Sequence, residues 1–373
     1  MTDTFTPANL TFARKRAGLT VTRLAKLVEL STSTITKYEA GAHPPPPETI
    51  DKLAEALDIR PTFLTAQPIE DLEPGVVSFR ALTRTSARQR DSALATGVLA
   101  TQLNNWLETR LNLPAPDVPK YERGALDPEG SARRLRAEWS LGYARVRNMV
   151  HLLEAHGVRV FSLAERLADV DAFSYWWKGT PYALLNTRKT YERGRFDAAH
   201  ELGHLVMHAD IDTPRGRDRE HEANRFAAAL LMPEEDVLTC GLRNAGVEQV
   251  LAAKERWGVA AMALAHRLHD LGITSDWTYT TTCRRLSELG YRRSEPDTSH
   301  PSERERSQIL EKSFALLRTG GIRQPDVAAE LHIRPEDLQE MLFGLTLTAV
   351  PGQGEATGRN EHRSLWLVSD ETS

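Results

Sequence analysis

The stretch Phe196-Asp197-Ala198-Ala199-His200-Glu201-Leu202-Gly203-His204 decides how the rest of this 373-residue chain is interpreted. It places two histidines four residues apart, with a glutamate directly after the first. On an α-helix four residues make a little over one turn, so His200 and His204 lie on one face, about 6 Å apart along the axis. Two imidazoles on that face can bind one Zn²⁺ at about 2.0–2.1 Å each. The stretch therefore predicts a helix that carries a metal site.

Glu201 follows the first predicted ligand and need not bind the metal itself. It can hold an activated water, take its proton and pass that proton to a leaving amine. The helix is expected to be buried, because apolar residues recur at helical spacing: Phe196, Ala199, Leu202, Val206 and Met207. A buried face that carried these polar groups without a metal would be costly. We therefore expect Glu201 to be a catalytic residue.

A site with two histidines needs a third protein ligand. The next predicted helix opens with carboxylates, and Glu220 is the expected ligand. Asn224 lies one turn further on and can hydrogen-bond a ligand imidazole. Glu222 points about 200° away from Glu220 around the helix axis and stays open as the alternative ligand. His208 lies roughly 12 Å along the axis from His200, so a place at the helix end or behind a ligand is expected for it.

Two motifs together resemble the ImmA/IrrE family of zinc metallopeptidases. They are His-Glu-Leu-Gly-His-Leu-Val-Met-His (200–208) and Glu-x-x-Ala-Asn-Arg-Phe-Ala-Ala-x-Leu-Leu-Met-Pro (220–233), and the resemblance covers roughly residues 130–270. It implies a zincin-like domain that cleaves a DNA-binding protein of the phage-repressor type and so derepresses its genes. By ligand chemistry alone, Mn²⁺ or Fe²⁺ would suit two histidines and a carboxylate nearly as well as Zn²⁺.

Residues 8–67 predict a compact helical domain. The first helix ends at Gly18, Thr20 caps a second helix over residues 21–28, and Ser31 or Thr32 caps a third. Two short helices joined by a tight turn, the second rich in small hydrogen-bonding residues, are typical of a helix-turn-helix.

Within this domain, Gly-Leu-Thr (18–20), Ser-Thr-Ser-Thr-Ile (31–35) and Tyr-Glu-Ala-Gly (38–41) resemble the phage-repressor (XRE) type. The resemblance implies that four side chains of the third helix point into the DNA major groove: Thr32, Ser33, Thr36 and Lys37.

Local charge agrees with a double-stranded DNA operator as partner. The formal net charge of the chain is −4, so any nucleic-acid surface must be local. Six basic residues crowd the first three helices: Arg14, Lys15, Arg16, Arg23, Lys26 and Lys37. The alternative is that the domain is a protein-interaction module without DNA.

The other segments predict mostly helical structure. We expect a linker over 66–79, a packing or dimerisation helix over 79–110 with a basic start, and an interrupted helix over 130–156. Strands at 158–161, 172–177 and 182–186 predict a small sheet whose edge can hold an extended peptide. Tyr175, Trp176 and Trp177 could line that cleft or pack in the core.

Beyond residue 233 the pattern is again helical. Residues 257–268 resemble a small helix-turn-helix packing unit, and a charged loop is expected over 292–306. In the helical segment 307–345, the stretch Asp326–Ile333 echoes a helix-turn-helix but suggests no chemistry. A mobile stretch is expected over 351–363, and residues 365–368 are too few to interpret.

The predicted fold class is α+β and mostly helical. The predicted domains are a five-helix helix-turn-helix domain (1–67), a linker and connecting helix (68–120), a zincin-like metallopeptidase domain with a small sheet (121–272), and a helical C-terminal region with a mobile tail (273–373). The two cysteines lie far apart, which predicts a reducing compartment. No apolar run reaches about 18 residues and no signal pattern opens the chain, so we expect a cytoplasmic protein without a membrane partner.

These features predict a DNA-binding transcriptional regulator with zinc-dependent endopeptidase activity. Its substrate would be a repressor-type protein or another copy of the chain, and cleavage would derepress stress, prophage or toxin–antitoxin-like genes. The alternative is a transcription factor whose peptidase-like domain is a non-catalytic sensor or docking module. Glu201 favours the enzyme, because a pure sensor has no need of it. A homodimer is compatible with the sequence.

Overall fold

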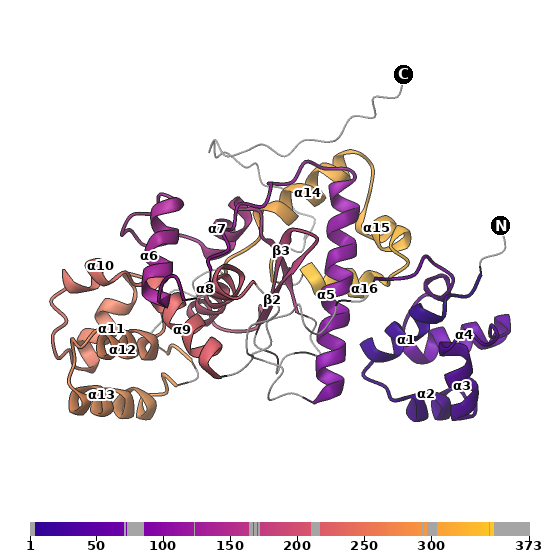
Figure 1. Cartoon of the computed structure of the whole chain (residues 1–373), viewed down its shortest axis with the longest axis horizontal. Coiled ribbons are helices and arrows are strands. Elements are labelled where there is room, and N and C mark those ends of the chain that lie inside the picture. Colours follow the sequence, from indigo (N-terminus) through magenta and orange to yellow (C-terminus); the bar gives the residue numbers. More distant parts are fainter. Residues whose placement is uncertain are drawn as a thin grey trace, which may run out of the picture. The chain divides into compact units, whose positions relative to one another are not determined.

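The computed structural model describes residues 4–70, 72, 86–122, 124–163, 167, 170, 172–209, 217–292, 294–296, 304–342 and 344–346. Within these residues, many helices and one three-stranded sheet confirm the mostly helical α+β class (Figure 1). The predictions for residues 73–85 and 347–373 lie outside the described residues. In the described part, no helix is both long and apolar enough to cross a membrane.

The chain forms two compact units. The first comprises residues 1–113, 161–170 and 308–373, and the second comprises 114–160 and 171–307. The expected C-terminal region, 273–373, is thus divided between the two units.

The first unit begins with the helix-turn-helix domain. Its helices are α1 (Pro7–Arg16), α2 (Val21–Leu27), α3 (Thr32–Glu39), α4 (Pro47–Leu57) and the 3₁₀ helix η1 (Pro61–Leu64). This confirms the five-helix prediction. The Thr20 and Ser31 side chains accept hydrogen bonds from the first turns of α2 and α3, at 3.1 and 3.0 Å. The domain core is apolar and at most 1% exposed: Leu10, Leu24, Ile35, Leu53 and Leu57.

Four further helices complete the first unit. They are α5 (Ala87–Glu108), α14 (Gln308–Thr319), α15 (Gln324–Glu330) and α16 (Pro335–Leu342). A capping box between Ser86 and Gln89 begins α5. Small and apolar side chains are buried around most of this helix, as expected for a packing helix. The basic residues Arg80 and Arg84, expected at its start, lie outside the described residues.

The second unit holds the motif helices and strands β2 and β3 of the sheet. Its helices are α6 (Pro128–Glu138), α7 (Met149–Ala155), α8 (Tyr191–Met207), α9 (Arg217–Leu231), α10 (Glu234–Leu238), α11 (Val247–Lys254), α12 (Ala261–Asp270) and α13 (Asp276–Glu288). The sheet contains β1 (Arg159–Ser162), β2 (Ala172–Trp177) and β3 (Thr180–Leu185) in the order β1-β3-β2.

Strands β2 and β3 form an antiparallel hairpin that closes at the pair Trp177 and Thr180. The two turn residues, Lys178 and Gly179, both have positive φ (47° and 84°). This is the backbone that two-residue hairpins favour, because its twist matches that of the strands. Strand β3 therefore begins at Thr180 and not at the expected residue 182, and Pro181 belongs to the strand.

The two motif helices, α8 and α9, lie side by side (Figure 1). They pack closely where Gly203 meets Phe226. A Cβ atom on Gly203 would lie only 2.9 Å from Cδ1 of Phe226, whose side chain is fully buried. A larger residue at position 203 would therefore push the two helices apart. This contact sets the distance between the histidines of α8 and the glutamates of α9.

The described residues of the charged loop expected over 292–306 form neither helix nor strand, but two of its carboxylate side chains, Glu295 and Glu305, are not solvated. Both are buried and receive backbone N–H groups at helix starts: Glu295 from Ala261 at 3.3 Å, and Glu305 from Met149 at 2.8 Å. Glu295 also pairs with the buried Lys254 at 2.8 Å. A carboxylate at a helix N-terminus is favourable because it satisfies free N–H groups and the helix dipole.

Gly203→Ala should be less stable than the matched variant Gly194→Ala. Both substitutions lie on α8 and gain about 1 kcal/mol of helix propensity. A Cβ at position 194 meets nothing within 4 Å, whereas one at 203 meets Phe226. Overpacking should cost about 1–3 kcal/mol at Gly203 only. Urea unfolding of both variants measures the difference, and equal stability would show that Phe226 moves aside without cost.

Candidate functional site

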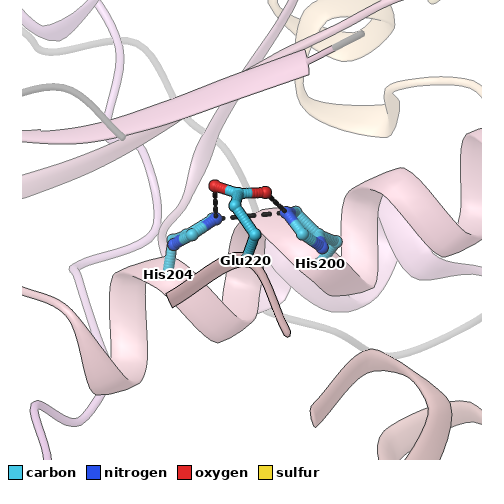
Figure 2. A group of neighbouring side chains, drawn as sticks. All are labelled: His200, His204 and Glu220. Atoms are coloured by element: carbon cyan, nitrogen blue, oxygen red, sulfur yellow. Dashed lines mark hydrogen bonds and ion pairs between the residues drawn. The ribbon is translucent and has the colours of Figure 1, made fainter. Parts of the chain in front are cut away.

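Helix α8 brings His200 and His204 together on its buried face. Their side chains are each 3% exposed, and their Nε2 atoms lie 3.1 Å apart (Figure 2). The four-residue spacing produces this proximity because the two side chains stand one above the other on the helix. The structure therefore places both predicted histidines as the sequence spacing requires.

Glu220 reaches the same point from the first turn of α9. Its Oε2 lies 3.4 Å from Nε2 of His200, and its Oε1 lies 3.4 Å from Nε2 of His204 (Figure 2). One ligand atom from each of the three residues can be chosen so that all lie within 4.8 Å of one another. In the part of the chain that the structure describes, these three side chains form the group of His, Cys, Asp or Glu residues that could hold a metal ion.

The other ring nitrogen of each histidine faces a polar partner. Nδ1 of His200 lies 3.0 Å from Oδ1 of Asn224, and Nδ1 of His204 lies 3.0 Å from Nδ1 of His208. An amide oxygen only accepts, so Nδ1 of His200 donates and its Nε2 presents a lone pair. These contacts fix the ring orientations and direct both Nε2 atoms to one point.

Glu222, the alternative third ligand, lies elsewhere. Its Oε2 is 2.8 Å from Nε2 of His208, so it continues the chain of contacts that starts at His204. His208 follows the last residue of α8 and is 9% exposed. In this arrangement Glu220 faces the two predicted ligands, and Glu222 supports the residue behind one of them.

The donor set fits a small divalent cation. In a tetrahedral site with ligands at about 2.0–2.1 Å, two ligand atoms are separated by about 3.4 Å. The observed separations between ligand atoms are 3.1, 3.4 and 3.4 Å. Three donors on one side leave a fourth position open, which is the pattern of catalytic rather than structural zinc sites.

The protonation states suit a cation too. Burial lowers the pKa of His204 to about 3, so this imidazole is neutral at pH 7. Burial opposes ionisation of Glu220, but the adjacent imidazoles of His200 and His204 outweigh it and lower its pKa to about 2. His204 and Glu220 therefore present a neutral nitrogen and an ionised carboxylate, the forms that bind metals.

Glu201 lies on the same helix in a different environment. It is 2% exposed, and burial raises its pKa to about 7, against the opposing effects of His200 and a hydrogen bond from Ser174. The Ser174 hydroxyl on β2 donates to Oε2 of Glu201 at 2.7 Å. A carboxyl with a pKa close to neutrality can both take and return a proton at physiological pH.

Strand β2 carries one aromatic side chain in the core, Tyr175, and two that are half-buried, Trp176 and Trp177. Tyr175 is 1% exposed and stacks on Tyr182 with ring centroids 4.9 Å apart, so it is a core residue. Trp176 is half-buried, and its Nε1 donates to the carbonyl of Leu205 on α8 at 3.1 Å. Trp177 is half-buried at the hairpin. The strand is thus fixed along the motif helix.

The predicted DNA-contacting residues share one surface of α3. Thr32, Ser33, Thr36 and Lys37 are all exposed, while Ile35 and Tyr38 face the core. The expected basic surface is smaller than the sequence suggests. Arg14 pairs with Glu39 at 2.6 Å, and the side chain of Arg16 is 6% exposed and pairs with Asp337. Arg23, Lys26 and Lys37 remain exposed.

Family comparisons agree with both parts of this architecture. Residues 12–64 match the helix-turn-helix family model, and residues 153–269 match the model of the IrrE N-terminal-like domain, a peptidase family. The chain therefore carries a helix-turn-helix domain followed by an IrrE-like peptidase-family domain, which confirms the resemblances drawn from the sequence.

One similar protein is "Uncharacterized immunity region protein 2" of Bacillus phage phi105. It is 31% identical over 74 residues, which is 18% of this chain and 47% of that protein. The chain thus spans about half the length of this relative.

Sequence reasoning missed two members of the site, Ser174 and the pairing of His208 with Glu222. A serine inside an otherwise apolar strand, Ala-Phe-Ser-Tyr-Trp-Trp, was the available signal for the first. For the second, the sequence shows that both residues exist but not that α9 returns Glu222 to the end of α8. Asn224, by contrast, was expected beside a ligand imidazole and lies there.

The raised pKa of Glu201 predicts a pH-dependent stability of the metal-free protein. Its folded-state pKa of about 7 exceeds the usual 4.5, so the stabilisation from the neutral form is present below pH 4.5 and is lost as the pH rises through 7. As the pH rises across this window, the free energy of unfolding of wild type should therefore fall by about 3 kcal/mol relative to that of Glu201→Gln. Urea unfolding of chelator-treated proteins at several pH values measures the difference.

The matched control is Glu288→Gln, which removes an exposed carboxylate on α13 and should follow wild type. If Glu201→Gln also followed wild type at every pH, the buried carboxyl would not be protonated in the folded protein.

Proposed function

We propose that this chain is a DNA-binding regulator with zinc-dependent endopeptidase activity. The observation that carries the proposal is the convergence of His200, His204 and Glu220 beside Glu201, whose pKa lies near 7. We assign the metal ligands to His200, His204 and Glu220, with Mn²⁺ or Fe²⁺ as alternatives to Zn²⁺. We assign proton transfer to Glu201.

Different residues of the chain would carry out different steps of peptide hydrolysis. A cation held by the three ligands would polarise the scissile carbonyl and lower the pKa of water. Glu201 takes the proton of the attacking water and returns it to the leaving amine. Ser174 holds the Glu201 carboxyl by its hydrogen bond, and the buried surroundings keep that carboxyl in the pKa range where both transfers are effective.

The proposed substrate is a repressor-type protein, or another copy of this chain, and cleavage would derepress stress, prophage or toxin–antitoxin-like genes. Support comes from the joining of a helix-turn-helix domain to a peptidase-family domain in one chain. The name of the phage relative places that protein in an immunity region, which fits a link to repressor control. We further propose that α3 reads a double-stranded operator through Thr32, Ser33, Thr36 and Lys37.

Metal content gives the first test of the peptidase site. Wild type should hold about one zinc ion per chain, and His204→Ala should hold almost none, because losing one of three ligands weakens the site severely. His221→Ala is the matched control, since this exposed histidine lies next to Glu220 but outside the ligand group. Elemental analysis after dialysis measures the content. Equal metal in wild type and His204→Ala would remove the assigned ligands.

Glu201→Gln separates an enzyme from a sensor. It should retain the metal and lose cleavage by a factor of about 10²–10⁴, because the proton-transfer group is gone. Purified XRE-type repressors and the Glu201→Gln chain itself serve as candidate substrates, with mass spectrometry of the products. If regulation in cells persists in Glu201→Gln with metal bound, the domain is a non-catalytic sensor.

Lys37→Ala should weaken DNA binding, because it removes a cation that the surface of α3 would bring close to the DNA phosphates. The slope of log affinity against log salt should fall by about 1. Fluorescence anisotropy with labelled duplexes at several salt concentrations measures both. An unchanged slope would place Lys37 outside the DNA interface.

A further inference from the structure

The helix-turn-helix of α2 and α3 recurs in α15 and α16. Helix α2 spans Val21–Leu27 and α15 spans Gln324–Glu330, while α3 spans Thr32–Glu39 and α16 spans Pro335–Leu342. Each bound of the first pair returns 303 positions later, since 324 minus 21 and 342 minus 39 both give 303. The last residue of α1, Arg16, corresponds in the same frame to Thr319, the last residue of α14.

The backbone repeats in the same frame. The turn between the two helices has positive φ at Glu29 (57°) and at His332 (55°), and the turns after the first and third helices repeat at glycines. Those glycines are Gly18 and Gly41 in the first copy, and Gly321 and Gly344 in the second, with φ of 63°, 70°, 85° and 71°. Bonds outside the helices repeat as well: Leu30 N–H donates to Ala25 O, and Ile333 N–H donates to Ala328 O.

The core positions also correspond without a gap. The pairs are Leu24 and Val327, Ala25 and Ala328, Ile35 and Leu338, and Tyr38 and Met341, and every member is at most 5% exposed. A matched core with matched turns, helix bounds and frame means that α15 and α16 repeat α2 and α3, and α14 ends where α1 ends in the same frame. The similarity noted in residues 326–333 is therefore one part of a longer second copy of the helix-turn-helix.

The two copies differ in charge on the surface that would face DNA. In the N-terminal copy this surface carries Arg23, Thr32, Ser33, Thr36 and Lys37; the corresponding residues of the second copy are Asp326, Pro335, Glu336, Gln339 and Glu340. A helix that enters a DNA groove must lie close to phosphates, which repel carboxylates. The second copy therefore lacks the chemistry to read DNA.

The second copy contacts the first. Arg16, at the end of α1, pairs with Asp337 of α16, and both side chains are at most 10% exposed. Arg334, directly before α16, pairs with Asp58 at the end of α4. Asp337 and Arg334 correspond to Thr34 and Ser31 of the first copy, so the second copy carries charged contact residues where the first has small ones.

Helix α5 contacts both copies. Near its start, the Ser92 hydroxyl donates to the carbonyl of Arg16 at 2.9 Å. Near its end, Nε1 of Trp106 and Nη2 of Arg110 donate to Oε2 of Glu330 on α15, at 2.8 and 2.6 Å. These contacts lie 14 residues apart on one helix, or about 21 Å.

We propose that α14–α16 form a charge-reversed helix-turn-helix unit whose partner is the N-terminal helix-turn-helix domain of the same chain. Its surface binds the ends of α1 and α4 and leaves α3 as the one DNA-reading helix of the pair. The buried Arg16–Asp337 pair sets the alignment of the contact, because a shift of one copy along the other would separate the two charges within the buried interface. The DNA part of this proposal rests on the proposed DNA binding by α3, and the contact between the copies does not.

The contact is tested by hydrogen exchange on the full-length chain. Asp337→Asn should speed amide exchange in α1 and in α14–α16 by about 100-fold, because it removes the buried carboxylate that pairs with Arg16. Glu336→Gln, the neighbouring exposed carboxylate, is the matched control and should change exchange by less than about twofold. Exchange in Asp337→Asn equal to wild type would overturn the proposal.

A double variant guards against simple unfolding. Arg16→Met with Asp337→Asn removes both charges, so it should exchange more slowly than Asp337→Asn alone. The effects of Arg16→Met and Asp337→Asn alone are measured as well. If the free-energy changes of the two single variants add up to that of the double variant, the two side chains do not interact.

The division of labour is tested with position-matched variants and a labelled duplex of random sequence at low salt. Lys37→Ala should weaken binding by about fivefold to tenfold, whereas Glu340→Ala, at the corresponding position, should change it by less than about twofold. Weakening by Glu340→Ala or Gln339→Ala equal to that of Lys37→Ala would show that the second copy also reads DNA. If Lys37→Ala has no effect, DNA reading by α3 fails, and hydrogen exchange still decides the contact.

Discussion

Burial of two imidazoles one turn apart on α8 is the constraint on which the peptidase-like unit depends. Polar side chains in a core need partners, and here the surrounding elements supply them. Asn224 approaches from α9, Ser174 from β2, and His208 from the helix end. Closer to the start of α8, the buried Arg195 guanidinium pairs with Glu305 and donates to the carbonyl of Val146 at 2.6 Å. The helix is thus held along its length by polar contacts as well as by apolar packing.

The environments of two carboxyl groups of similar intrinsic acidity give them very different pKa values. Glu220 lies between two imidazole nitrogens and has a pKa of about 2, while Glu201 is enclosed and has a pKa of about 7. The first is therefore suited to a permanent negative charge and the second to proton exchange near neutrality. Such a separation of pKa values is a common way to assign ligand and acid–base roles within one site.

The sequence predicted elements where local signals were strong. The predicted bounds of β2 and the predicted start of α2 agree with the structure, because an aromatic run and a Thr N-cap mark them locally. Prediction from the sequence failed where a side chain interacts with a residue that lies far away in the sequence. Nothing near Arg16 reveals that its charge is neutralised by Asp337, so the basic surface was overestimated. Similarly, Glu295 and Glu305 suggest a solvated loop until the helix N-termini they cap are known.

The Arg16–Asp337 pair also has a consequence for biosynthesis. Its partners are separated by 321 residues, and the peptidase-like unit lies between them in the sequence. At about 5–20 residues per second, a ribosome would make Asp337 roughly 15–60 s after Arg16. During that interval the N-terminal domain can close its own apolar core, but the face that receives α16 stays open to water and to chaperones. The first part of the chain to emerge is therefore among the last to reach its final packing.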